Sequence, residues 1–167
     1  MGVSSIPGCE TGAMCQYINY VAENLVYFSM AQNLIGPAGY YRDNSSVDNY
    51  ASYLADSVFL PTLNNERGDD ATKAATKSKF ASLDRAMLVM FDGDTVVHPQ
   101  ESEWFQQFVP GTTEVEPLKD SAFWIDDYIG LRALDEAGKV SYVSITGDHL
   151  QFSEEDIQNT FIPFLLA

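Results

Sequence analysis

The chain has 167 residues, 46% of them apolar, and a formal net charge of −15. This length and composition allow one hydrophobic core, so we expect a single domain. The acidic balance excludes a nucleic-acid partner, because such a partner requires a basic face that neutralises phosphates. There is no apolar run as long as a bilayer requires, so no transmembrane segment is predicted.

The first half of the chain predicts helices. Residues 16–35 carry apolar side chains at helical spacing, and Gly36-Pro37 then stops the helix. Residues 47–60 are a shorter amphipathic stretch, which we expect Pro61 to end. After the polar loop NNERGDD, residues 71–83 predict a short helix with its lysines on the solvent side.

Two strands are predicted in the second half. AMLVMF, residues 86–91, is a continuous apolar run, as expected for a strand buried on both faces of a sheet. KVSYVSIT, residues 139–146, alternates as a half-buried strand does.

Helical signals separate and follow these strands. Pro99 opens a short helix through SEWFQQF, and residues 111–121 are predicted as a loop. Residues 129–138 predict a helix with a glycine C-cap, and Ser153 begins the last helix because acidic residues follow it. The order strand, helix, strand, helix gives an α/β fold class. About two core strands are predicted, where an open sheet usually has five or six.

The two loops that follow the strands carry candidate catalytic residues. Asp92-Gly93-Asp94 follows the first strand and Gly147-Asp148-His149 follows the second. Ligands bind beyond the carboxyl ends of parallel strands, so both loops lie where a site would form. An aspartate and then a histidine in this order match the end of the hydrolase sequence Ser, Asp, His. Such an aspartate would fix the tautomer of the histidine, which then accepts a proton from the nucleophile.

Structural roles compete with these assignments. His149 can equally be a loop histidine that caps the following helix, and Asp94 can be an ordinary turn carboxylate. His98, the other histidine, precedes Pro99, and we expect it at a helix entrance with a structural role. VMFDGDTVV also resembles the phosphatase pattern D-x-D-G-T, although Thr95 here follows the second aspartate directly.

Two further features point outside the cytosol. Cys9 and Cys15 bracket a turn and could close a short disulfide loop, or they could remain reduced thiols of a cytosolic protein. Asn44-Ser45-Ser46 is a sequon for N-glycosylation in a polar stretch.

Several motifs together resemble the palmitoyl-protein thioesterase family. They are GVSSIPGC near the start, LNNERG, SEWF at 102–105, IGLRALDEAGK, GDHLQFSEE and IPFL at 162–165. GDHLQ, SEWF and the cysteine pair in this order are more specific than any one motif. The resemblance implies an α/β-hydrolase that removes long fatty acyl chains from cysteine thioesters in the lysosome or vacuole lumen, or after secretion, without metal or cofactor. Its partners would be S-acylated proteins or peptides and long-chain acyl thioesters.

The resemblance also implies roles for particular residues. Asp94 would be the acid of the catalytic triad and His149 its base. Cys9 and Cys15 would form a family disulfide. Residues 17–63, approximately, would be a helical insertion that forms the acyl groove. Asp92 and His98 match no family position and receive no role.

The nucleophile of the family is absent from these 167 residues. No G-x-S-x-G turn occurs, and no serine follows a buried strand into a helix. We therefore expect an incomplete α/β-hydrolase fold, with residues 1–167 forming the C-terminal part of one domain. One interpretation is a thioesterase whose N-terminal segment is missing from the sequence or from a shortened isoform. The alternative is an inactive remnant or an acyl-binding module. Under either interpretation we expect the chain alone to be inactive.

Overall fold

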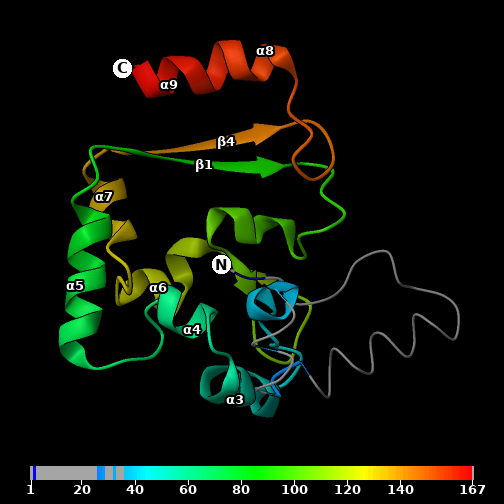
Figure 1. Cartoon of the computed structure of the whole chain (residues 1–167), viewed down its shortest axis with the longest axis vertical. Helices are drawn as coiled ribbons and strands as arrows, with labels where there is room; N and C mark the ends of the chain where they lie inside the picture. Colours follow the sequence, from blue (N-terminus) through cyan, green and yellow to red (C-terminus); the bar gives the residue numbers. More distant parts are fainter. Residues whose placement is uncertain (1, 3–25, 29–31, 33–35, 167) are drawn as a thin grey trace, which may run out of the picture.

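The computed structural model describes residues 2, 26–28, 32 and 36–166 (Figure 1). Cys9, Cys15 and most of the helix predicted over residues 16–35 lie outside these ranges. The first half contains η1 (Gly36–Tyr40), α3 (Val47–Asp56), α4 (Leu60–Leu63) and α5 (Asp70–Ala81). The second half contains β1 (Ala86–Phe91), η2 (Gln100–Trp104), β2 (Gln107–Phe108), β3 (Val115–Glu116), η3 (Leu118–Asp120), α6 (Ala122–Ile125), α7 (Leu131–Glu136), β4 (Val140–Ile145), α8 (Glu154–Asp156), the π-helical segment η4 (Ile157–Phe161) and α9 (Ile162–Leu166).

Side-chain caps set the starts of α3 and α5. The Ser46 side chain accepts a hydrogen bond from Asn49 N at the start of α3, and Asp69 caps α5 in the same way. The predicted end of the first of these helices is wrong, because α3 stops at Asp56 and Pro61 lies in the first turn of α4. Proline is tolerated there because the first turn leaves its N–H groups without helical partners in any case.

The two predicted strands are confirmed, and they pair in parallel. The register runs from Ala86 opposite Val140 to Phe91 opposite Ile145. Figure 1 shows β1 and β4 side by side with their carboxyl ends at the same edge. Functional loops of parallel sheets gather at that edge, so this register positions the candidate site.

The expectation that β1 is buried on both faces is wrong. Met90 and Phe91 are buried, whereas the first four residues of the strand are only half-buried. The reason is that β1 and β4 form a sheet of two strands within the described part of the chain. One face of this sheet packs on the main core through Leu88 and Val140. That core is an aromatic and aliphatic cluster of Phe105, Leu118, Phe123, Trp124, Ile129 and Leu131.

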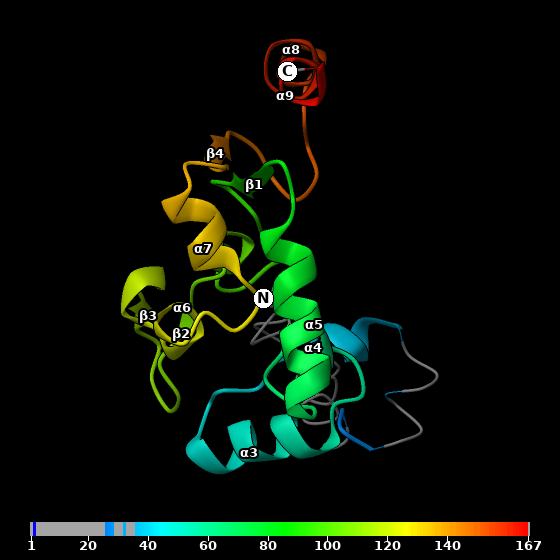
Figure 2. The same cartoon turned by 90° about the vertical axis from the view of Figure 1, so that its left-hand side faces the viewer.

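The segment predicted as a loop over residues 111–121 contains the short strand β3 and the turn η3. The prediction is therefore wrong for these five residues, and α6 was not predicted. The last helix begins as predicted, with Ser153 and Asp156 exchanging hydrogen bonds in a capping box. Viewed end-on, α8 to α9 stand apart from the helices below the sheet (Figure 2). The longest described helix, α5, has 12 residues, and none of the described helices has the length and hydropathy of a bilayer span.

Candidate functional site

The loops after β1 and β4 are joined to each other at the carboxyl edge of the sheet. Gly93 N donates to Gly147 O at 3.0 Å, and a β-carbon at Gly93 would lie 3.0 Å from that same oxygen. Thr95 donates from both its N–H and its hydroxyl to Asp148 Oδ1 at 2.8 Å. These contacts hold together two segments that are more than 50 residues apart in the sequence.

The carboxylate of Asp94 faces the ring of His149. His149 Nδ1 lies 2.7 Å from Asp94 Oδ2, so the contact predicted from the sequence is confirmed. The Asp94 side chain is fully buried, whereas that of His149 is 32% exposed. With the Nδ1 proton directed at Asp94, the other ring nitrogen, Nε2, is left to accept a proton. Within the described ranges, the His149 ring makes this one hydrogen bond, so its Nε2 has no protein partner there.

The charge on Asp94 is stabilised by its hydrogen bonds. Burial alone would raise the pKa of this carboxyl. Hydrogen bonds from Val97 N, from His149 and from Val96 N outweigh burial and hold the pKa below the ordinary aspartate value. The two amides reach Oδ1 at 2.7 Å each. Asp94 is therefore poised as the anion that orients the imidazole of His149.

The other acidic residues of the two loops have structural roles. Asp92 accepts hydrogen bonds from Thr146 Oγ1 at 3.0 Å and from Gly147 N at 3.2 Å. Asp92 therefore joins the two loops, whereas Asp94 bonds to the ring of His149. This division disfavours the phosphatase alternative, in which both aspartates would face one phosphate and one metal ion.

His98 packs against a ring and does not bond to Asp94. Its ring centroid lies 5.2 Å from that of Phe108. His98 and Asp94 both line a pocket of about 300 Å³ beside the β1 loop, together with residues of the segment that leads into η2. The expectation that His149, and not His98, faces Asp94 is therefore confirmed.

Glu103 is a member of this site that was not predicted from the sequence. Glu103 lies on η2, and its Oε2 accepts a hydrogen bond from Phe91 N at 2.8 Å. Among the described residues, one side-chain atom from each of Asp94, Glu103 and His149 lies within 4.8 Å of the others. Glu103 belongs to the SEWF motif, so the motif was the available signal, but its role depends on a contact that the motif does not reveal. That the site uses no metal stays a prediction.

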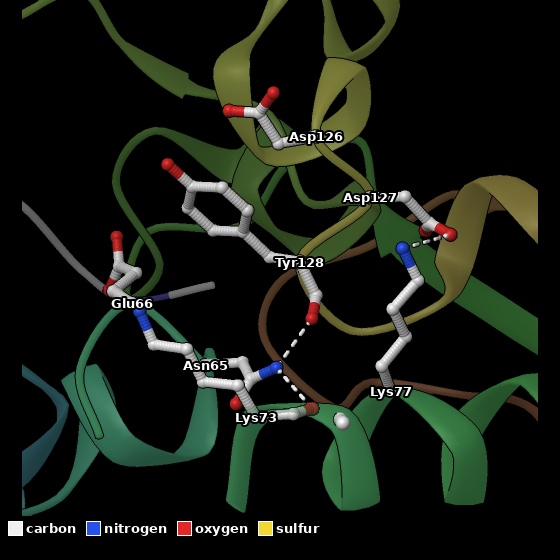
Figure 3. A pocket seen from close by; sticks show the side chains of 8 residues that line it. Asn65, Glu66, Lys73, Lys77, Asp126, Asp127 and Tyr128 are labelled. Atoms are coloured by element: carbon white, nitrogen blue, oxygen red, sulfur yellow. Dashed lines mark hydrogen bonds and ion pairs between the residues drawn. The ribbon is translucent and has the colours of Figure 1, made fainter. Parts of the chain in front are cut away.

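A polar pocket of about 270 Å³ lies elsewhere, between α5 and the loop after α6 (Figure 3). In it, Lys77 points towards Asp127, with 3.2 Å between Nζ and Oδ2. Asn65 joins the two sides by donating to Lys73 O and Tyr128 O. The lining residues include no residue of the β1 and β4 loops, so this pocket is separate from the Asp94–His149 pair.

The geometry at the predicted glycosylation sequon does not favour a glycan. Asn44 is 2% exposed, and its Nδ2 donates a 2.7 Å hydrogen bond to Phe108 O. N-glycosylation attaches the glycan to this side-chain nitrogen, so a glycan would require the side chain to leave the interior.

Comparisons with known proteins show the family to which the chain belongs. The family described as Palmitoyl protein thioesterase matches residues 1–149. "Palmitoyl-protein thioesterase 1" of Caenorhabditis elegans is 29% identical over 96% of this chain and 53% of its own length. "Palmitoyl-protein thioesterase 3" of Dictyostelium discoideum is 28% identical over 89% of this chain and 52% of its own length. "Lysosomal thioesterase PPT2-B" of Xenopus laevis is 34% identical over 68% of this chain and 38% of its own length. The chain thus spans about half the length of the first two of these relatives.

Proposed function

This chain belongs to the palmitoyl protein thioesterase family, and from that membership we propose that the whole protein hydrolyses long-chain fatty acyl thioesters of protein cysteines. Its substrates would be S-acylated proteins or peptides. The observation that carries the proposal is the 2.7 Å contact between Asp94 and His149. An aspartate held as an anion, and a histidine whose Nε2 has no partner among the described residues, are two of the three members of a hydrolase triad.

In the proposed mechanism, the nucleophile is a serine from a segment outside these 167 residues. His149 Nε2 takes the proton of the serine hydroxyl as the serine oxygen attacks the thioester carbonyl. Asp94 keeps the tautomer and stabilises the imidazolium. The imidazolium then donates its proton to the departing cysteine thiolate, and an acyl-enzyme remains. Water, activated by the same nitrogen, releases the fatty acid and restores the serine.

An apolar pocket of about 420 Å³ is a second candidate place for an acyl chain; like the polar pocket, it includes no residue of the β1 and β4 loops. It is lined mainly by Leu63, Phe80, Leu83, Phe105 and Ile129. Leu63 ends the stretch that we propose as the helical insertion of the family. Pockets of this size and character are typical of sites for apolar ligands.

We propose the cellular setting from the names of two relatives. Proteins from Xenopus laevis and Drosophila melanogaster are named lysosomal thioesterases, so we propose the lysosome lumen for the whole protein. A Cys9–Cys15 disulfide is compatible with that compartment. In this proposal, residues 1–167 are the C-terminal part of a single α/β-hydrolase domain.

The test is a thioesterase assay of the whole protein on a palmitoyl-cysteine peptide. We expect His149→Ala and Asp94→Asn each to reduce turnover by on the order of 10⁴-fold, as for a lost triad member. His98→Ala removes the other imidazole and should leave most of the activity. The 167-residue chain alone should be inactive. Turnover by this chain that disappears in His149→Ala would contradict the missing-nucleophile mechanism. An inactive whole protein that still binds palmitate would favour an acyl-binding module.

A further inference from the structure

Glu103 approaches the Asp94–His149 pair from a different element. It is held on the 3-10 turn η2, which follows Pro99 and packs on β1. Its neighbour Trp104 fixes this turn on the strand by donating from Nε1 to Leu88 O at 3.1 Å. Glu103 itself accepts the N–H of Phe91, the last residue of β1. The carboxyl group is therefore fixed at the carboxyl edge of the sheet.

The two neighbouring carboxyl groups differ in how many donors they meet. Asp94 accepts two backbone N–H groups and faces His149, and each of these contacts favours its anion. Within the described part of the chain, Glu103 accepts a hydrogen bond from one donor, the Phe91 amide. Two carboxylates this close repel, so a shared proton goes to the group whose anion is less well solvated. That group is Glu103.

The pKa directions of the two groups agree with this difference. Burial raises the pKa of Glu103, the bond from Phe91 N opposes this, and the charge of Asp94 raises the pKa further. The pKa of Asp94 is held low. Among the described residues, the ionisable groups that act on Glu103 are Asp94 and His149, and Asp148 acts on His149 from the β4 loop. Environments that separate two carboxyl pKa values assign the proton to one partner.

We propose that Glu103 is a positioning residue of the site: its protonated side chain accepts from Phe91 N, donates to the Asp94 carboxylate and so keeps that carboxylate directed at His149. The catalytic consequence rests on the proposed function, whereas the location of the proton does not. Ionisation of Glu103 removes the donated bond and adds a second negative charge beside Asp94. The contribution of this contact is therefore present at acidic pH and lost as pH rises through the raised pKa of Glu103.

Carbon-13 NMR of the 167-residue chain with labelled glutamate carboxyl groups tests where the proton lies. The carboxyl signal that is absent from the spectrum of the Glu103→Gln variant is assigned to Glu103. We expect it to titrate at higher pH than an exposed glutamate, and at lower pH once Asp94→Asn removes the neighbouring charge. The control, Glu101→Gln, removes the same charge from the same turn and should leave the Glu103 signal unmoved. A Glu103 signal that titrates as in an exposed side chain would overturn the proposal. So would a shift of it on addition of Zn²⁺ or Mg²⁺ at micromolar concentration, because the three side chains would then form a cation site.

Kinetics of the whole protein test the positioning role. Glutamine keeps both hydrogen bonds, so Glu103→Gln should stay within about threefold of wild-type kcat at acidic pH. Its activity should persist to higher pH than that of wild type, because an amide does not ionise. Glu103→Ala should reduce kcat, rather than raise KM, by on the order of 10–100-fold, the effect of a misplaced catalytic group. Equal losses in both variants would overturn the proposal. If the NMR result is as expected but the wild-type whole protein is inactive, the proposed function fails and the proton assignment stands.

Discussion

At the scale of single residues, buried polar groups form two clusters. One is the candidate site, and the other surrounds Arg42 and Glu66. Arg42 and Glu66 form an ion pair at 2.9 Å with side chains only 3% and 5% exposed. The hydroxyls of Tyr50 and Tyr53 donate to the same Glu66 carboxylate at 3.1 and 2.5 Å. Burial opposes the charge of Glu66, but Arg42 and the Tyr53 hydroxyl outweigh it and hold its pKa below the ordinary value. Because Glu66 lies in the loop between α4 and α5, this cluster fixes the position of that loop.

We predict that Glu66→Gln destabilises the folded protein by about 3–5 kcal/mol, because it leaves the Arg42 charge buried without its partner. The control is Asp135→Asn. Asp135 Oδ2 lies 3.7 Å from Lys119 Nζ, and the Lys119 side chain is 71% exposed. That change should cost less than about 1 kcal/mol. Urea unfolding at neutral pH measures both.

The same variant should change the response to acid. A lowered folded-state pKa gives stability that is present above the ordinary glutamate pKa and is lost as pH falls through the folded value. Wild type should therefore lose more stability on acidification than Glu66→Gln does. Equal losses would show that the Arg42–Glu66 pair contributes nothing to acid unfolding.

At the scale of elements, the packing of α5 against α7 depends on a single glycine. Gly130 precedes α7 with a φ of +90°, in the left-handed region. A β-carbon there would lie 2.6 Å from Lys77 O and 2.9 Å from Ala81 Cβ, both on α5. The backbone of a helix cannot move aside as a flexible side chain can, so glycine is required for this approach.

We predict that Gly130→Ala destabilises the protein by about 2–4 kcal/mol, since overpacking adds to backbone strain. Gly138→Ala is the matched control. Its φ is +72°, and no atom lies within 4 Å of the added carbon. Strain alone should then cost about 1 kcal/mol. Thermal or urea unfolding of the two variants separates the clash from the strain, and equal costs would refute the packing argument.

At the scale of the whole molecule, the described part of the chain leaves apolar surface without cover. The sheet has two strands, so each strand has one edge without a strand neighbour in the described ranges. The terminal helix exposes Leu165 and Leu166, which are 73% and 81% accessible. It meets the strand end through Phe164, whose ring lies 5.0 Å from the guanidinium carbon of Arg85. Exposed apolar faces and strand edges promote association between copies, even in a chain with a net charge of −15.

We predict that the 167-residue chain self-associates as its concentration rises and that Leu165→Ser with Leu166→Ser reduces this. Val47→Ser is the control, because Val47 is 71% exposed on α3, away from the terminal helix. Light scattering after size-exclusion chromatography gives the mass of each variant. An unchanged mass distribution in the double variant would assign the association to the strand edges instead.

Local sequence determined the elements whose signals act within a few residues. The strands over 86–91 and 140–145, the lysine-bearing helix α5 and the Ser153 capping box were all predicted, because apolar periodicity and capping involve neighbouring residues. The order of Asp94 and His149 along the chain also predicted that they lie together. Parallel strands place their carboxyl ends at one edge, and the two residues follow those ends directly.

Only the tertiary structure decided which groups surround that pair and which surfaces are covered. Glu103 reaches the site because η2 packs on β1, and Asn44 is buried because its amide finds Phe108 O, 64 residues away. The incomplete burial of β1 follows from the number of neighbouring strands, which the apolar run AMLVMF does not specify. The apolar periodicity of a segment predicts which of its faces can be buried. Contacts between distant segments depend on how the elements pack together.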